Sequence, residues 1–174
     1  MSNIESLIQE IEQEAQTTRR VLERVPNDRL AWKPHERSMS LGQLALHVAT
    51  LTGFVAEMAS QSPFQIPQFT QPTVMSASEL LPALDKSVAR AQDVLRKIGD
   101  SGLAKTWRAV DGDRELMALP VGAVLRSIML NHWYHHRGQL SVYLRQLEVP
   151  VPSIYGPSAD ENPFQASQPS AVLA

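Results

Sequence analysis

The stretch from Pro120 to Leu147, PVGAVLRSIMLNHWYHHRGQLSVYLRQL, decides the fold. Its apolar residues recur at steps of three and four, which is the spacing of one face of an α-helix. Pro120 suits the first position of a helix, because the N–H that it lacks would have no partner there. Pro150 and Pro152 follow soon after the last apolar residue and stop the pattern. The stretch therefore predicts one long amphipathic helix over residues 120–147.

Three other segments have the same periodicity. The first covers residues 3–25, before a Pro-Asn-Asp break. The second begins at Ser40, which with Gln43 has the spacing of a capping box. The third begins near Ser78 and stops at the glycine-containing cluster of residues 99–102. Four long helices with little strand signal predict an all-α fold, a four-helix bundle.

The connections are less regular. Residues 60–76, between the second and third helices, hold three prolines and predict a long crossover loop. Residues 105–119 contain an Asp-Gly pair that could make a small hairpin or an irregular excursion, and we expect little strand there. The end of the chain is rich in Pro and Ser. We expect one bundle domain over residues 1–158 and an irregular, partly flexible tail over residues 159–174.

Composition excludes several classes of function. Sixteen Lys plus Arg against eighteen Asp plus Glu give a net charge of −2, which does not favour a nucleic-acid partner. No apolar run approaches the roughly 20 residues of a membrane helix, and no secretory leader is recognisable, so we expect a cytoplasmic protein without a membrane partner. The chain has no cysteine. A thiol nucleophile and Cys-ligated metals are therefore excluded, and any metal must be held by His, Asp or Glu.

Histidine is the residue type that most needs an explanation. His132 and His136 lie one helical turn apart on the same face of the predicted helix, and His47 falls on the apolar stripe of the second helix. Three imidazoles from facing helices can bind one divalent cation and leave coordination positions open. The alternative is that these histidines are core or surface residues with hydrogen-bond partners. The pattern alone leaves both interpretations open.

The two remaining histidines, and the residues that follow His136, have other expected roles. His35 lies in a polar loop and is expected at the surface, and His135 is expected to be exposed or to lie behind the ligands. Gly138, in the middle of a helix, suggests close packing against a neighbouring helix. Arg137 is expected to be solvated, with binding of an anionic substrate as the alternative. No Asp or Glu lies one turn from a candidate ligand on the apolar stripe, so catalytic and substrate-binding residues stay unknown.

Several segments, in order, resemble the DinB-like family of metal-dependent enzymes, the DinB/YfiT superfamily. Residues 132–140, HWYHHRGQL, are similar to its HxxxHRGQ signature. Residues 32–47 resemble the family's entry into its second helix, and residues 149–160 resemble the closing segment of a subgroup. The resemblance implies a four-helix bundle, frequently a homodimer, with a divalent metal on three histidines. Carried over by position, the ligands are His47, His132 and His136.

Three functions fit such a centre. A metal on neutral imidazoles lowers the pKa of bound water towards roughly 7, which suits a hydrolase of a small-molecule substrate. The same centre could bind a low-molecular-weight thiol, as in the thiol transferases and isomerases of the family, and that thiol would be a cosubstrate. In the third case the protein is not an enzyme, and the metal only links two helices and stabilises the fold. Zinc or nickel is the expected metal, and iron also suits imidazole.

Overall fold

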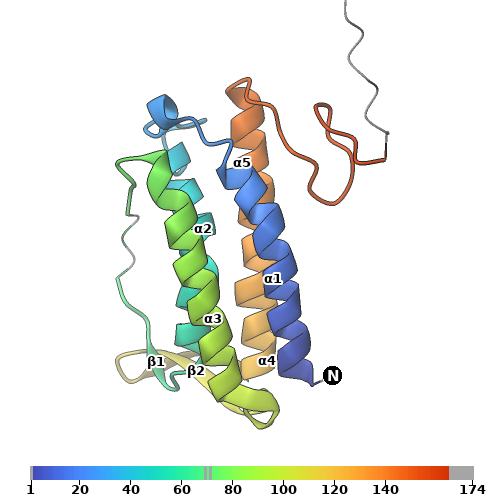
Figure 1. Ribbon diagram of the computed structural model, residues 1–174. Helices are drawn as coiled ribbons and strands as arrows, with labels where there is room; N and C mark the ends of the chain where they lie inside the picture. Colours follow the sequence, from blue (N-terminus) through green and yellow to red (C-terminus); the bar gives the residue numbers. More distant parts are fainter. Residues whose placement is uncertain (1, 69, 71, 165–174) are drawn as a thin grey trace, which may run out of the picture.

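Four helical rods lie side by side in the computed structural model, which describes residues 2–68, 70 and 72–164 (Figure 1). The fourth rod is continuous but changes its winding from α to π and back to α. The predicted four-helix bundle is confirmed. Within the described residues, no helix is long and apolar enough to cross a membrane. The rods are α1 (Asn3–Leu22), α2 (Leu41–Ala59), α3 (Leu80–Gly102), and the fourth formed by α4 (Val121–Val124), the π-helical η3 (Leu125–Asn131) and α5 (His132–Gln146).

The helix boundaries follow from local chemistry. The Ser40 hydroxyl accepts a hydrogen bond from the Gln43 N–H at 3.2 Å, and the Gln43 side chain accepts one from the Ser40 N–H at 2.9 Å. This is the predicted capping box at the start of α2. Gly99, near the end of α3, has φ +61°, a left-handed conformation that interrupts the helix. Helix α3 is therefore interrupted and ends within residues 99–102, as the sequence predicted.

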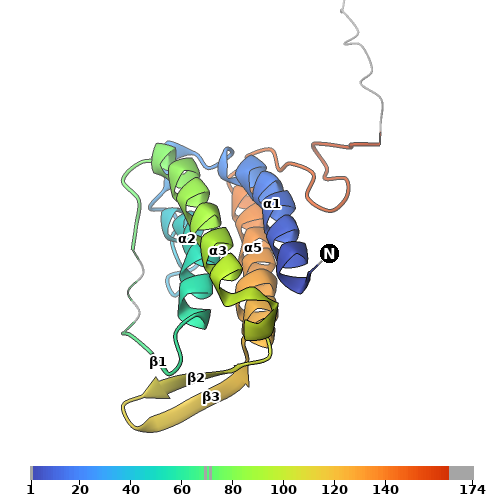
Figure 2. The ribbon, with the colours of Figure 1, turned by 60° about the horizontal axis from the view of Figure 1, so that its bottom comes forward.

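Of the two alternatives for residues 105–119, the structure has the hairpin, so the expectation of little strand there was wrong. Strands β2 (Thr106–Asp111) and β3 (Arg114–Pro120) form an antiparallel hairpin, and the short β1 (Phe64–Gln65) from the crossover pairs with β2 in parallel. Figure 2 shows the hairpin lying across one end of the bundle. Nearly every residue of β3 is exposed. The strand therefore lacks the alternation of apolar and polar residues by which strands are recognised in sequences.

Helices α2 and α3 pack closely at Gly53. A Cβ atom there would lie 2.8 Å from the backbone oxygen of Ser87. The Ser87 hydroxyl accepts a hydrogen bond from the Gly53 N–H at 2.8 Å. Glycine suits this position because any larger residue would force the two backbones apart.

The chain after α5 returns towards α1. Glu161 accepts hydrogen bonds from the Ser153 N–H and from Arg20 of α1. Asp160 accepts one from the Val151 N–H at 2.8 Å. From residue 165 onward, the tail expected to be flexible lies outside the described residues.

Candidate metal centre

Three histidine rings converge between α2 and α5. The ring centroids lie 5.2 Å apart for His47 and His132, 4.7 Å for His47 and His136, and 4.5 Å for His132 and His136. One ring nitrogen from each residue can be chosen so that all three lie within 4.8 Å of one another. The structure thus brings together the three histidines singled out in the sequence.

A buried hydrogen bond fixes the two helices at this level. The Trp133 indole N–H donates to the backbone carbonyl of Val48 at 2.9 Å. Trp133 is fully buried. Because Trp133 follows His132 and Val48 follows His47, this single bond sets the register of the two helices where the histidines meet.

Hydrogen-bond partners indicate the tautomer of two of the rings, His132 and His136. His136 Nδ1 lies 2.9 Å from the side-chain oxygen of Gln139, which can only accept, so this nitrogen carries the hydrogen. His132 hydrogen-bonds to the backbone carbonyl of Ile128, one turn earlier in the π segment. The Nε2 atoms of His132 and His136 face each other at 2.7 Å. With the second hydrogen bond of each ring made to Gln139 or to Ile128, both Nε2 atoms are available to a cation placed between them.

The surroundings keep the rings neutral. Burial, followed by the charges of His136 and His132, lowers the pKa of His47 to about 4. Burial is also the main cause that lowers the pKa of His132 and of His136. Neutral imidazole is the form that binds a metal, so at neutral pH no proton has to be removed first.

The donor set fits a divalent transition metal. Among the described residues, the group contains no carboxylate or other ligand besides the three imidazoles. Three nitrogen donors suit zinc, nickel or iron and leave positions open for water or substrate. The sequence identified no general base, and the geometry likewise places no Asp or Glu in the group.

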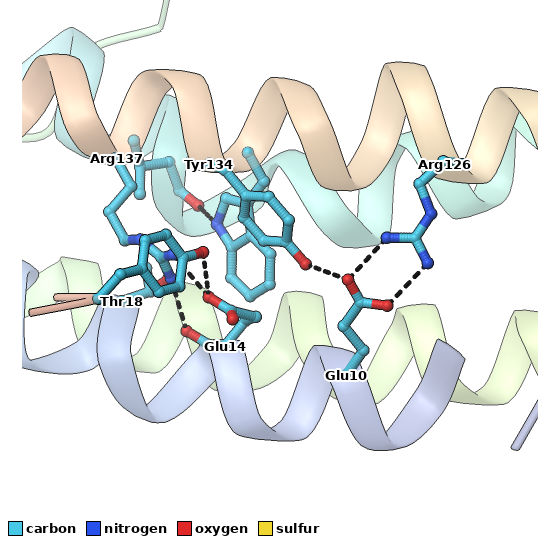
Figure 3. Close-up of polar contacts among 9 residues, drawn as sticks. Glu10, Glu14, Thr18, Arg126, Tyr134 and Arg137 are labelled. Atoms are coloured by element: carbon cyan, nitrogen blue, oxygen red, sulfur yellow. Dashed lines mark hydrogen bonds and ion pairs between the residues drawn. The ribbon is translucent and has the colours of Figure 1, made fainter. Parts of the chain in front are cut away.

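Arg137 corrects an expectation. It is 1% exposed and reaches towards α1 (Figure 3). Its guanidinium donates to the Glu14 carboxylate at 2.6 Å, to the Thr18 hydroxyl at 3.1 Å, and to the Tyr155 hydroxyl. It is therefore neither solvated nor placed to bind a substrate at the histidines. The signal in the sequence was Glu14, an acidic residue on the apolar stripe of α1 that needs a buried partner.

The predictions for Gly138 and for the two histidines outside the group had mixed outcomes. Gly138 is exposed, and a Cβ atom added there would meet nothing within 4 Å, so the prediction of close packing was wrong. His35 is exposed, as predicted. His135 is also exposed, with its ring centroid 4.9 Å from that of His136.

A second polar cluster joins α1 to the fourth rod (Figure 3). Arg126 makes two hydrogen bonds, of 2.7 and 2.8 Å, to the carboxylate of Glu10. The Tyr134 hydroxyl donates to the same carboxylate at 2.7 Å. The bond from Arg126 is the main reason why the pKa of Glu10 lies below its ordinary value, and burial is the main reason why the pKa of Tyr134 is raised. The face of the fourth rod opposite the histidines is thus anchored at two levels.

Comparisons with known proteins agree with this arrangement. The model of the DinB family matches residues 1–167. The chain is 27% identical over 149 residues to the uncharacterized protein YrdA of Bacillus subtilis, covering 85% of each protein. It is 28% identical over 133 residues to the uncharacterized protein YjoA of the same organism, covering 75% of this chain and 81% of YjoA.

Solved structures share the fold. A DinB-like protein of Bacillus cereus superposes with a TM-score of 0.67 at 23% identity, covering 87% of this chain and 97% of that one. The structure of Bacillus subtilis YjoA gives a TM-score of 0.61 at 20% identity, covering 83% of this chain and 95% of that one. At these identities the likeness shows a common fold.

Proposed function

Because the chain belongs to the DinB family, we propose that it is a metal-dependent hydrolase whose three histidines hold one divalent transition metal. The observation that carries the proposal is the 2.7 Å approach of the Nε2 atoms of His132 and His136. Gln139 and the Ile128 carbonyl hold the hydrogens on the far sides of these rings. A shared cation would be held by both of these nitrogens, with His47 as the third ligand.

The residues of the chain prepare this site in three ways. Burial keeps the imidazoles neutral, so they are ready to bind a metal at pH 7. The Trp133–Val48 bond and the Arg137–Glu14 pair hold α5 against α2 and α1. When bound, the metal would supply a Lewis acid and lower the pKa of a coordinated water towards roughly 7. We propose zinc or nickel as the metal, because the donors are all imidazole.

A substrate screen tests the proposal. Protein purified without a histidine tag would be loaded with zinc or nickel and assayed on esters, amides and electrophiles, with and without added low-molecular-weight thiols. We expect turnover without thiol that is lost after EDTA treatment and in His132→Ala. The exposed His135→Ala is the matched control and should keep its activity.

Two other results would replace the proposal. Turnover seen only with an added thiol would make the protein a thiol transferase or isomerase, with the thiol bound at the same metal. A stoichiometric metal that stabilises the fold, with no turnover of any substrate, would leave the metal a structural role.

A further inference from the structure

A cavity of about 390 Å³ lies against His47, between α2 and the crossover that follows it. Its wall includes Thr50 and Leu51 from α2, and Pro67 and Gln68 from the crossover. The volume lies within the usual range of small-molecule sites. Because His47 also belongs to the histidine group, a molecule in this cavity would lie beside one of the three proposed ligands.

The wall of the cavity carries no formal charge among its described residues. The crossover contributes none, since residues 58–78 contain no Asp, Glu, Lys or Arg. On α2, the lining residues other than His47 are Gln, Thr, Leu and Phe, which carry no charge. A charged group placed against this wall, away from the proposed metal, would lose its hydration without meeting a counter-ion, which costs free energy.

The wall is also largely apolar. Leu51 is buried, and Phe54, one turn further along α2, offers an aromatic ring that is 46% exposed. Pro67 presents a ring without a backbone donor. The Thr50 hydroxyl already donates to the Leu46 carbonyl at 2.8 Å. Contact with an apolar group is therefore what this wall offers most.

We propose that the cavity holds an uncharged, apolar acyl or aryl group of the substrate and excludes groups that carry a carboxylate or an ammonium. The proposal rests on the proposed function, because it places the reacting bond beside His47 at the metal. It narrows the substrate to a class: an ester, amide or electrophile whose part next to the reacting bond is a hydrocarbon.

Hydroxamates with one common metal-binding head test the cavity separately from the metal. The probes are acetohydroxamate, octanohydroxamate, and the eight-carbon hydroxamate that ends in a carboxylate instead of a methyl group. Calorimetry on the zinc-loaded protein measures their affinities. We expect octanohydroxamate to bind at least ~10-fold more tightly than acetohydroxamate, the gain from burying about two methylene groups. We expect a preference of at least ~10-fold over the carboxylate-tailed probe as well, because its end group would have to lose its hydration.

A cation introduced into the wall should reduce the preference for the methyl-tailed probe. Gln68→Lys places a cation at the cavity and should strengthen binding of the carboxylate-tailed probe by about fivefold or more. Gln65→Lys makes the same change at an exposed position of β1 outside the lining and should leave all three affinities unchanged.

Each contrary result has its own meaning. Equal binding of the methyl-tailed and carboxylate-tailed probes to the unaltered protein would overturn the apolar cavity, and so would equal binding of all three. An equal gain in Gln65→Lys would do the same, because the cation would then act from outside the cavity. If no hydroxamate binds, including acetohydroxamate, the proposed metal site fails and this inference fails with it.

Discussion

Replacing Arg137 with Met should destabilise the protein strongly, because the change leaves a buried carboxylate without its cation. Arg137 is 1% exposed, and the side chain of its partner Glu14 is 11% exposed. Met retains an apolar stem of similar length, so the main loss is the charge and its hydrogen bonds. The Tyr155 hydroxyl still reaches Glu14 at 2.8 Å and keeps one hydrogen bond in place.

The size of the effect follows from this burial. Removing one partner of a buried ion pair costs about 3–5 kcal/mol, and the remaining bond from Tyr155 favours the lower end, about 3 kcal/mol. For a chain of this length, 1 kcal/mol corresponds to about 2–4 °C in melting temperature, so we expect a decrease of roughly 6–12 °C. Urea denaturation and thermal melts in EDTA, followed by circular dichroism, measure both quantities without a contribution from bound metal.

Arg126→Met is the matched control. Its side chain is 50% exposed and pairs with Glu10 on the same helix α1, so its loss should cost less than about 1 kcal/mol. In the double variant Glu14→Gln/Arg137→Met, the loss should be smaller than the sum of the two single losses, because no unpaired charge remains. Equal losses in Arg137→Met and Arg126→Met would refute the reasoning.

Three other changes have defined outcomes. Metal should be released only below pH 6.5, because the pKa of His47 is lowered to about 4 and protons compete for the ring only as the pH falls towards that value. A titration of bound metal against pH checks this. Half-release at or above pH 6.5 would contradict it. Gln139→Leu removes the support of a ligand ring and should lower metal affinity about 10–100-fold in competition with a chelator, whereas unchanged affinity would deny it that role. Gly53→Ala should lower the free energy of unfolding by about 1–3 kcal/mol in urea denaturation, because its Cβ would lie 2.8 Å from the Ser87 oxygen. Gly138→Ala, in open space, should raise the free energy of unfolding by up to about 1 kcal/mol. The reverse order would contradict the packing described.

The helices could be predicted from the sequence because each has a strong local signal. The periodicity of residues 120–147 and the capping box at Ser40 do not depend on distant parts of the chain. Pro120, predicted at the first position of the helix, is the last residue of β3 and immediately precedes α4. Local chemistry therefore located the bundle and the faces that carry the histidines.

What could not be predicted depends on tertiary contacts. The exposed strand β3 has no buried face to give it a pattern. Arg137 is buried only because Glu14 and Thr18, more than a hundred residues earlier, supply its partners. The π segment before His132 and the two supports of the ligand rings likewise arise from the folded arrangement.

Elemental analysis tests the shared metal most directly. Protein purified without a histidine tag should carry about one equivalent of transition metal per chain. That metal should be lost in His47→Ala and in His136→Ala, and retained in His135→Ala. Retention of a full equivalent in either ligand variant, or its loss in His135→Ala, would contradict the proposal that His47, His132 and His136 hold a single ion.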